Sequence, residues 1–574
     1  MRFIFSSLPA LLAAAVGLTG QVATAVPHNG VHHHDASAGI AARSDLHARA
    51  TVATPPASDF VLAGLVGQAP TTRNYEFTIS EMTGAPDGFS KSMLVVNGQF
   101  PGPAIEANQG DRLVIKVTNA LSDNRTTIHW HGLYQNGTVW YDGTASVTDC
   151  GIPPGDSLTY DFELGQFSGT TWYHSHYATQ YSDGVTGPLI VYPTASAPSG
   201  FPTWDGDLIV HLTDVYHTFS AALVQQYLSG TGPTAPIILE TPDSGAINGV
   251  GQYDGSTNYF NFDLAPNKTY RLRLIHTGSA AQIRFSVDYH PLTIIEVDGT
   301  LVEPYDVVGL TLLVAQRYSV LITTNQTAGN GSYWIRSDLI SPVTVDGTTS
   351  EVLGVITYTG ENSTSVPTAT SDPGVPGSNL ADMDVSQLTP AVVDTPPDRT
   401  RFYQVDFAIG ATSTGGTIAQ INGTSWSPLQ GTATLLQVAG NTSYAAEGSS
   451  VEGGNQLIIT EDSIETVDIL LTNTGAGDHP FHLHGHRPWI MGFGTGTYDG
   501  QDLTPSNPLR RDTFTVPSGG WLMLRYVSDN PGPWTLHCHI AWHMEAGLLM
   551  QVNSLPSVTA GLNIPSDIAS QCAA

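Results

Sequence analysis

Positively charged side chains are scarce in this chain of 574 residues. Lys and Arg together number 20 against 50 Asp and Glu, so the formal net charge is -30. Such an acidic chain repels nucleic acid and anionic membranes, which excludes a nucleic-acid partner and a role at a membrane surface. The charge suits solubility in an acidic extracellular medium, and it would also attract cationic or neutral substrates.

Long hydrophobic runs are missing after the N-terminus, where no stretch has the length of a membrane helix. The N-terminus has one Arg, an apolar run and small residues ending at Ala25, which predict a secretory signal peptide over residues 1–25. Residues 26–68 are predicted to form a leader or pro-segment without fixed structure, most clearly up to about Ala50. The histidines at 32–34 could bind a metal weakly, but a flexible tract is the preferred interpretation.

Eight Asn-x-Ser/Thr sequons agree with secretion, because this motif is the acceptor of N-linked glycans in secreted proteins. They begin at Asn124, Asn136, Asn267, Asn325, Asn330, Asn362, Asn422 and Asn441. We therefore expect a secreted, extracellular glycoprotein.

Cysteine is rare, with only Cys150, Cys538 and Cys572 in the chain. In an oxidising compartment two of them should pair and one should be left over. If Cys538 is a metal ligand, Cys150 and Cys572 are the remaining pair, and their disulfide bond would tie the C-terminus back to the first domain.

Charged residues make up only 12% of the chain, whereas Gly (59) and Pro (37) are plentiful, which indicates many strands and turns rather than long charged helices. Alternating apolar segments recur, including RLVIKVTN, SLTYDFEL, YRLRLIH and TVDILLTN. No long segment with a 3.6-residue period competes with them, so the sequence predicts an all-β protein. The length suits about three domains.

Internal repeats support three β-sandwich domains. Residues 110–132 parallel residues 461–485, since both run through a strand and a turn to a histidine cluster that ends in Gly. Residues 267–285 have the strand and the turn without the histidines. We predict domains at 69–195, 196–360 and 401–574, with a Pro/Ser/Thr-rich linker at 361–400 and metal sites in the first and third domains.

Ten of the 20 histidines fall in four short motifs. The motifs are HWH (His129, His131), HSH (His174, His176), HPFHLH (His479, His482, His484) and HCH…H (His537, His539, His543). A lone histidine is most often a surface residue or a hydrogen-bonded core residue. Burying this many imidazoles without a function would require a partner for every ring nitrogen, so a metal cluster is the better explanation.

Strand geometry assigns a direction to each side chain of these motifs. In a strand, each H-x-H presents two imidazoles on one face, and four such pairs supply eight ligands for several metal ions. Cys538 would point the opposite way and form, with His479 and His543, the His₂Cys set typical of a blue copper centre. Zinc is the alternative metal, but a zinc site would not need eight further histidines. Several one-electron metals suit a multi-electron acceptor such as O₂.

At these residues the sequence resembles the multicopper oxidase family, and fungal laccases or laccase-like enzymes in particular. The resemblance covers roughly residues 74–550 and includes HWHGLYQNGT, WYHSHYATQYSDGVTGP, HPFHLHGH and NPGPWTLHCHIAWH. It implies three cupredoxin-like Greek-key domains and four coppers per chain. It also implies one-electron oxidation of phenols or aromatic amines, coupled to four-electron reduction of O₂ to water, in a protein expected to be a monomer.

The resemblance also implies the role of each ligand. His129 and His482 would hold the type 2 copper, and Cys538, His479 and His543 the type 1 copper. One type 3 copper would be held by His131, His174 and His539, and the other by His176, His484 and His537. The catalytic set is then Cys538, His537 and His539, together with Asp142 as a carboxylate that assists proton delivery; a structural Asp in a turn before Gly is the alternative.

Further positions differ from the family or are matched less closely. Leu548 occupies the axial position and cannot coordinate, while Met544 and Met550 are expected to be ordinary apolar residues. Asp243, five residues before Asn248, resembles the acid that binds a phenol or amine in laccase pockets.

Three departures concern the surroundings of the site. Ala541 stands where relatives often have an acid, and Val215 stands where they often have Trp. The chain ends in DIASQCAA, so the C-terminal plug of many ascomycete laccases is expected to be absent.

Two alternatives remain open. The first is a ferroxidase or a pigment- or bilirubin-type multicopper oxidase, against which Asp214 stands where iron oxidases tend to have Glu. The second is a copper-binding protein without turnover, which the complete set of ten histidines and one cysteine disfavours.

Overall fold

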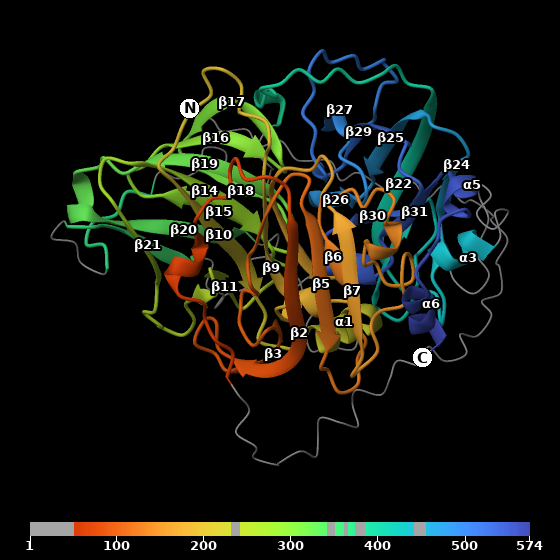
Figure 1. Ribbon diagram of the computed structural model, residues 1–574, viewed down its shortest axis with the longest axis horizontal. Helices are drawn as coiled ribbons and strands as arrows, with labels where there is room; N and C mark the ends of the chain where they lie inside the picture. Colours follow the sequence, from red (N-terminus) through yellow and green to blue (C-terminus); the bar gives the residue numbers. More distant parts are fainter. Residues whose placement is uncertain are drawn as a thin grey trace, which may run out of the picture. The chain divides into compact units, whose positions relative to one another are not determined.

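The computed structural model describes residues 51–230, 241–340, 351–360, 366–372, 385–440 and 455–573. These residues belong to one compact unit, Ala50–Ala574. The predicted signal peptide, the three consecutive histidines at 32–34 and the sequons at Asn362 and Asn441 lie outside the described residues. Strands make up 44% and helices 11% of the structure, which confirms the all-β prediction. The strands of the described residues form six sheets that fall into three successive pairs (Figure 1).

The first pair of sheets contains the HWH and HSH motifs. In spatial order, its sheets are β3 (Lys91–Val96), β2 (Thr72–Gly84), β5 (Arg112–Asn119) and β7 (Ser157–Glu163), and β4 (Ile105–Asn108), β9 (Thr186–Tyr192), β8 (Gly169–Ser175) and β6 (Ile128–Trp130). Strand β5 alternates as predicted, because Leu113, Ile115 and Val117 are buried while Arg112 and Lys116 are exposed. The buried face packs into a core of its own.

The middle pair of sheets contains no H-x-H motif. Its larger sheet is β12 (Val250–Gly251), β11 (Ser244–Ile247), β10 (Gly206–Val215), β14 (Thr269–His276), β19 (Arg317–Thr323), β16 (Leu292–Val297) and β17 (Thr300–Val307). Its smaller sheet is β13 (Phe260–Leu264), β21 (Leu353–Tyr358), β20 (Ser332–Ile340), β15 (Gln282–Val287) and β18 (Leu310–Leu312).

The third pair of sheets contains the HPFHLH and HCH motifs. One sheet is β23 (Thr417–Ile421), β22 (Arg401–Ala411), β25 (Thr466–Asn473), β29 (Gly520–Val527) and β27 (Trp489–Thr495). The other is β24 (Ile458–Glu461), β31 (Leu549–Ser554), β30 (Gly532–Cys538), β26 (His479–Leu483) and β28 (Thr513–Val516).

The repeats seen in the sequence reappear as one arrangement of three strands. Strand β5 lies between parallel β2 and antiparallel β7, β14 lies between parallel β10 and antiparallel β19, and β25 lies between parallel β22 and antiparallel β29. Mixed sheets of this kind are consistent with Greek-key sandwiches. The domain boundaries themselves remain predictions.

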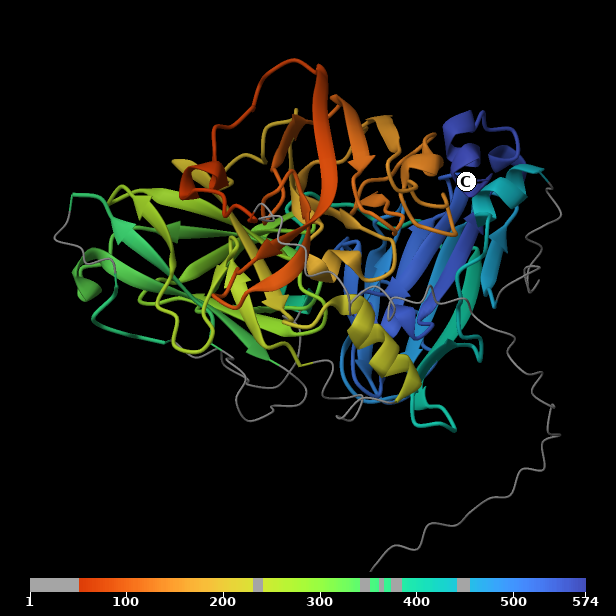
Figure 2. The ribbon, with the colours of Figure 1, turned by 90° about the horizontal axis from the view of Figure 1, so that it is seen from below.

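Helices are short and lie in the connections. In the parts of the chain that the structure describes, the α-helices are α1 (Ser220–Ser229), α3 (Thr434–Gly440), α4 (Ala541–Glu545), α5 (Pro556–Thr559) and α6 (Ser566–Ala573). The 3-10 helices are η1 (Ala57–Phe60), η2 (Val139–Tyr141), η3 (Gln180–Asp183), η4 (Ala328–Gly331) and η5 (Val385–Gln387). Figure 2 shows α1 beside the third pair of sheets, where the ring of Tyr227 lies 6.5 Å from that of His543. Among the described residues, no helix combines the length and the apolar character needed to cross a bilayer.

Residues 51–68, which the sequence analysis assigns to an unstructured leader, carry regular structure instead. Helix η1 buries Phe60, whose ring centroid lies 5.5 Å from that of Phe260 in the middle core. Strand β1 (Val61–Leu62) then pairs antiparallel with β10. The segment is ordered because an aromatic side chain and an edge-strand pairing attach it to the middle sandwich.

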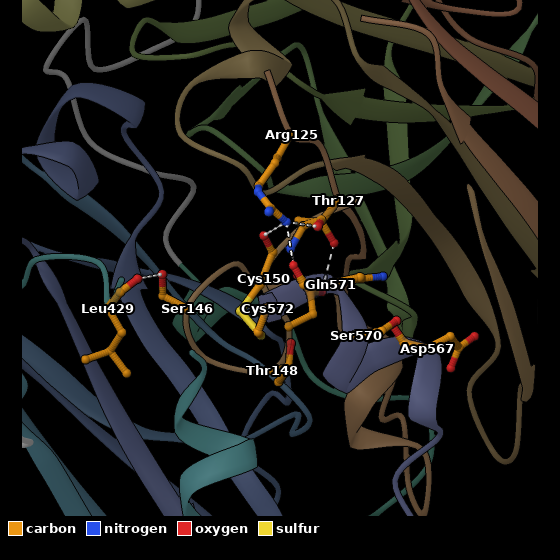
Figure 3. Close-up of a disulfide and its surroundings, with 12 residues drawn as sticks. Arg125, Thr127, Ser146, Thr148, Cys150, Leu429, Asp567, Ser570, Gln571 and Cys572 are labelled. Atoms are coloured by element: carbon orange, nitrogen blue, oxygen red, sulfur yellow. Dashed lines mark hydrogen bonds between the residues drawn. A yellow bond between two sulfur atoms is a disulfide. The ribbon is translucent and has the colours of Figure 1, made fainter. Parts of the chain in front are cut away.

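Cys150 and Cys572 form a disulfide bond, as predicted, and Cys538 is free and buried. The bond attaches α6 to the first sandwich, where Arg125 Nη1 also donates to the carbonyl oxygen of Gln571 at 2.7 Å (Figure 3). Ile568 of the same helix is buried in the core of the first sandwich. The C-terminal helix therefore belongs structurally to the first sandwich, although it follows the third in sequence.

Candidate metal centre

Two pairs of antiparallel strands carry the four H-x-H motifs. In the first sandwich, β6 and β8 place His129 opposite His174. In the third sandwich, β26 and β30 place His482 opposite His537. Residues opposite each other on paired strands share a face of the sheet, so each sandwich contributes one compact set of imidazoles.

The residue between the two histidines of a motif faces away from them. Trp130 lies in the core of the first sandwich, with its ring centroid 5.2 Å from that of Tyr160. Leu483 and Cys538 are likewise buried in the large core that includes the third sandwich. The predicted alternation of side chains therefore holds in all three of these motifs.

The eight imidazoles gather in one buried cluster that the first and third sandwiches share. Rings from the two sandwiches stack directly, because the centroids of His129 and His484 lie 3.9 Å apart and those of His131 and His482 lie 3.8 Å apart. Their ligand atoms form groups of three with every member within 4.8 Å of the others: His129/His131/His482, His131/His174/His539 and His176/His484/His537.

In three of these rings, hydrogen bonding engages one nitrogen and leaves the other free toward the cluster. Backbone carbonyl oxygens accept a hydrogen bond from the Nδ1 of three imidazoles: His129 to Asp142 (2.8 Å), His174 to Ser175 (3.0 Å) and His482 to Asp512 (2.8 Å). The Nε2 atoms of the same three rings are buried without a hydrogen-bond partner. A neutral imidazole has one N–H and one lone pair, so these Nε2 atoms are free to bind a metal ion.

A second group shows the spacing expected around a shared ion. The Nε2 of His537 lies 3.2 Å from that of His484 and 3.4 Å from that of His176. Metal–nitrogen bonds of about 2.0–2.1 Å in tetrahedral geometry place two ligand nitrogens roughly 3.3 Å apart. The outer nitrogens are again engaged: His537 Nδ1 donates to the carbonyl oxygen of Cys538, and His484 Nδ1 donates to the carboxylate of Asp142.

The sulfur of Cys538 faces a different pair of histidines. Its Sγ lies 3.6 Å from the Nδ1 of His479 and 3.6 Å from the Nδ1 of His543. A thiolate with two imidazoles is the donor set of blue copper sites, and hard ions such as Mg²⁺ or Ca²⁺ prefer oxygen ligands. The residues present therefore fit copper.

Burial favours the neutral form of most of these imidazoles. It lowers the pKa of His131, His174, His176, His482, His484 and His539 well below the usual value, and neighbouring histidines contribute to most of these shifts. Burial likewise lowers the pKa of His537 to about 4 and that of His479 to about 3. Neutral imidazole is the form that binds metal, so the cluster is ready for ligation at neutral pH.

Comparison with known proteins agrees with this donor set. Three multicopper oxidase family models match residues 78–196, 206–361 and 428–558. Laccase-1 of Botryotinia fuckeliana is 35% identical over 517 residues, which cover 87% of this chain and 86% of its own. The chain belongs to the multicopper oxidase family. Laccase-5 of Trametes villosa is 36% identical over 85% of this chain and 90% of its own.

Solved structures agree with the family at the level of the fold. A laccase from Botrytis aclada superposes with a TM-score of 0.76 at 31% identity, over 88% of this chain and 92% of its own. Fet3p, a multicopper oxidase that functions in iron import, superposes with a TM-score of 0.77 at 27% identity, over 88% and 94%. The oxidase is a laccase-like oxidoreductase with cupredoxin-like domains, and its histidine clusters bind copper.

Asp142 lies at the end of η2, buried beside the histidine cluster. One of its carboxylate oxygens accepts hydrogen bonds from His484 Nδ1 at 2.9 Å and from the Thr144 hydroxyl at 2.8 Å. Its other carboxylate oxygen lies 3.4 Å from His129 Nδ1. The residue therefore contacts one histidine from the first sandwich and one from the third.

Asp243 and Asp214 lie near the end of β10 in very different surroundings. The side chain of Asp243 is 44% exposed and accepts a hydrogen bond from the backbone N–H of His217 at 2.7 Å. Asp214 is only 4% exposed and accepts hydrogen bonds from the backbone N–H groups of three successive residues, Ser279 to Ala281 (2.7–3.0 Å). Asp243 can therefore meet a solute, whereas Asp214 is held within the fold.

Four of the other positions that differ from the family or lie off its pattern hold buried apolar residues. Leu548 is fully buried, and its carbonyl oxygen accepts a hydrogen bond from the backbone N–H of Cys538 at 3.1 Å. Met550 lies in the core on β31. Ala541 and Met544 line a small cavity of about 10 Å³ together with His174, His176, Tyr181, His537 and His539.

Sequence reasoning missed the residues that hold the cluster from outside. Asp512 and Thr513 both contact His131 Nε2, at 3.2 and 2.9 Å. Arg317 of the middle sandwich forms a two-pronged ion pair with Asp512. The only local signal was the charged RRD triplet between apolar segments, since Arg317 and Asp512 are separated by 195 residues.

Proposed function

We propose that this protein is a secreted laccase that oxidises phenols and aromatic amines by one electron and reduces O₂ to water with four coppers per chain. The type 1 copper would be held by Cys538, His479 and His543, and the type 2 copper by His129 and His482. The type 3 coppers would be held by His131, His174 and His539, and by His176, His484 and His537. When bound, these coppers supply the chemistry that accepts electrons from the substrate and delivers them to O₂.

One observation carries the proposal: a single strand, β30, serves both metal sites. Cys538 directs its sulfur toward His479 and His543, while its chain neighbours His537 and His539 direct their rings into the histidine cluster. The substrate side and the oxygen side are therefore joined by a few covalent bonds along the backbone. Such a connection suits one-electron intake at one place and multi-electron release at another.

The other residues of the chain orient ligands and handle protons. Carbonyl oxygens fix which nitrogen of His129, His174 and His482 bears the proton. Four protons must reach each reduced O₂, and Asp142, with a carboxylate oxygen on His484 Nδ1, is placed to hold and pass one. Ala541 has no side-chain proton to give where it borders the cluster, so proton delivery would depend on Asp142 and not on this position.

The substrate would be oriented by Asp243. Its exposed carboxylate can accept a hydrogen bond from a phenol hydroxyl or an aromatic amine, which also gives the released proton a destination. The acidic surface of the chain favours neutral or cationic substrates over anionic ones.

A ferroxidase is the second candidate, because Fet3p is among the solved structures that resemble this chain. The carboxylate at the relevant position, Asp214, is buried and accepts three backbone hydrogen bonds, so it is poorly placed to receive Fe(II). Steady-state rates on Fe(II) and on 2,6-dimethoxyphenol distinguish the two, and we expect the phenol to be strongly preferred.

An absorption spectrum with metal analysis tests the proposal directly. We expect a blue thiolate–copper band, a near-UV shoulder and about four coppers per chain. Cys538→Ser should abolish the blue band and phenol oxidation while the histidine cluster still retains copper. A colourless zinc protein, or normal phenol oxidation by the variant, would contradict the proposal. Absence of O₂ uptake with any reductant in a copper-loaded sample would favour a copper-binding protein without turnover.

Secretion, glycosylation and a monomeric state complete the proposal. The asparagines of the six described sequons are all exposed, so their side chains are open to glycan attachment. A mass shift on treatment of the secreted protein with an N-glycosidase would support glycosylation. Elution from a size-exclusion column at the mass of a single chain would support the monomeric state.

A further inference from the structure

We propose that Arg317 of the middle sandwich is a positioning residue for the histidine cluster, although the middle sandwich contributes no ligand to it. The inference rests on the proposed function, because it takes the eight histidines as copper ligands. Arg317 would act through Asp512, which contacts one histidine from the first sandwich and one from the third.

Asp512 holds the two histidines in different ways. Its side-chain Oδ1 lies 3.2 Å from the Nε2 of His131, and its backbone carbonyl oxygen accepts a hydrogen bond from the Nδ1 of His482 at 2.8 Å. The hydroxyl of Thr513 lies 2.9 Å from the same His131 nitrogen and donates to Asp512 Oδ1. A shift of Asp512 would therefore turn two rings that stack on each other, with centroids 3.8 Å apart.

Arg317 fixes the position of Asp512. Its Nη1 and Nη2 donate to the two carboxylate oxygens of Asp512 at 2.6 Å each, and both side chains are fully buried. This two-pronged geometry sets the orientation of the carboxylate as well as its location.

The guanidinium is itself held by the first and middle sandwiches. Its Nε donates to the carbonyl oxygen of Thr170 on β8, in the first sandwich, at 3.2 Å. Within the middle sandwich, Nη1 donates to the carbonyl oxygen of Ala315 at 3.1 Å and lies 3.4 Å from Asp298 Oδ1. One side chain thus joins all three sandwiches at the edge of the cluster.

The chain leaves room for this contact at the end of the HWH motif. A Cβ on Gly132, the residue after His131, would lie 2.6 Å from Asp512 Oδ2 and 3.1 Å from Arg317 Nη2. Gly132 also has a φ of 77°, which favours glycine. The approach of Arg317 and Asp512 to His131 is therefore built into the backbone.

Loss of Arg317 would leave Asp512 as a buried carboxylate without its cationic partner, and such a group has to move or rearrange its surroundings. Movement of Asp512 displaces the hydrogen bonds that orient His131 and His482. The sulfur of Cys538 lies instead beside His479 and His543, at 3.6 Å from the Nδ1 of each, so the geometry of this site should persist.

The experiment compares Arg317→Met with Arg336→Met in the full-length protein. Arg336 is the matched control, because it forms a comparable buried ion pair in the same sandwich, at 2.7 and 3.2 Å, but with Asp288 instead of Asp512. Each variant is loaded with copper and challenged with a chelator, and the measurements are total copper, the blue band and the paramagnetic resonance signal of type 2 copper.

We expect Arg317→Met to lose copper from the histidine cluster about tenfold faster than the wild type, with an altered type 2 signal and an unchanged blue band per folded molecule. Arg336→Met should retain the wild-type copper count and type 2 signal, even if its melting temperature falls as much as that of Arg317→Met. Arg317→Lys, which keeps the charge and loses the two-pronged geometry, should be intermediate.

A double variant covers the case in which Arg317→Met does not fold. Arg317→Met/Asp512→Asn removes both charges, and its copper loss should equal that of Asp512→Asn alone, because Arg317 acts through Asp512. Equal copper retention and equal type 2 signals in the Arg317 and Arg336 variants, or additive losses in the double variant, would overturn the inference. A wild-type protein that binds no copper at the cluster would instead overturn the proposed function.

Discussion

At the scale of single residues, Asp142 shows how one carboxylate can contact histidines of both the first and the third sandwich. It accepts a hydrogen bond from His484 and lies beside His129 through its other carboxylate oxygen. An asparagine at this position could still accept the hydrogen bond from His484, so the copper sites should survive, but it could not hold or release a proton.

We predict that Asp142→Asn lowers kcat by about 10²-fold, because general acid catalysis typically contributes this much. Bleaching of the blue band by substrate under anaerobic conditions should keep its wild-type rate, while reoxidation by O₂ should slow. Stopped-flow spectroscopy separates the two steps. A variant that is reoxidised at the wild-type rate would show that protons arrive by another route.

Asp183 is a buried carboxylate at the end of η3, next to the start of α1. It accepts a hydrogen bond from the backbone N–H of Ser220 at 3.0 Å, and burial raises its pKa to about 6. In the unfolded chain an aspartate ionises near its usual value of about 4. Between pH 4 and 6 the unfolded state therefore ionises first, and folding stability is lost as the pH rises.

We predict that Asp183→Asn removes this loss, which corresponds to roughly 3 kcal/mol for a gap of about two pKa units. The free energy of unfolding of the variant, relative to the wild type, should improve as the pH rises from 4 to 7. Urea unfolding at several pH values measures it, with Asp156→Asn as an exposed control. If the free energies of unfolding of Asp183→Asn and the wild type differ by the same amount at every pH from 4 to 7, Asp183 does not cause the loss of stability.

At the scale of elements, the HWH and HPFHLH motifs end in a glycine that lets the chain turn beside the cluster. Gly132 and Gly485 have φ values of 77° and 67°. A Cβ on Gly485 would lie 2.5 Å from the indole of Trp534, which is fully buried. The glycine that closes these repeats therefore follows from close packing as well as from the turn.

We predict that Gly485→Ala destabilises the protein by roughly 2–5 kcal/mol, the sum of left-handed strain and overpacking. Gly496→Ala is the matched control, because its φ is 75° and nothing lies within 4 Å of the added Cβ. It should cost only about 1–2 kcal/mol. Urea midpoints of the two variants should differ clearly, and equal midpoints would argue against the clash with Trp534.

At the scale of the whole molecule, the cluster depends on sandwiches that are far apart in sequence. The first and third sandwiches supply all eight imidazoles, and the disulfide bond joins Cys150 to Cys572, 422 residues later, so that the whole third sandwich lies inside the closed loop. A crosslink over so long a loop restricts the unfolded chain strongly.

We predict that Cys150→Ser/Cys572→Ser lowers the free energy of unfolding by about 2–4 kcal/mol. The blue band of the folded variant should stay unchanged, because Cys538 takes no part in this bond. Thermal unfolding followed by absorbance and circular dichroism measures both effects. Loss of the blue band at temperatures where the variant is still folded would mean that the bond also shapes the copper sites.

The sequence by itself determined the features that depend on local geometry. A strand repeats every two residues, so the H-x-H motifs already imply paired imidazoles, and HCH already implies a sulfur that faces away from them. Three cysteines allowed one disulfide bond once Cys538 was taken as a metal ligand. The repeats indicated three β-sandwich domains. These inferences need only neighbours along the chain.

Only the tertiary structure decided which distant residues meet. The pairing of β1 with β10, the burial of Asp214 and the network of Arg317, Asp512 and His131 depend on strand register and on packing between sandwiches. Arg317 carries no local pattern that marks it as functional, and it lies in a domain without ligands. Its partner is brought to it by the packing of the middle sandwich against the third, which no short stretch of sequence encodes.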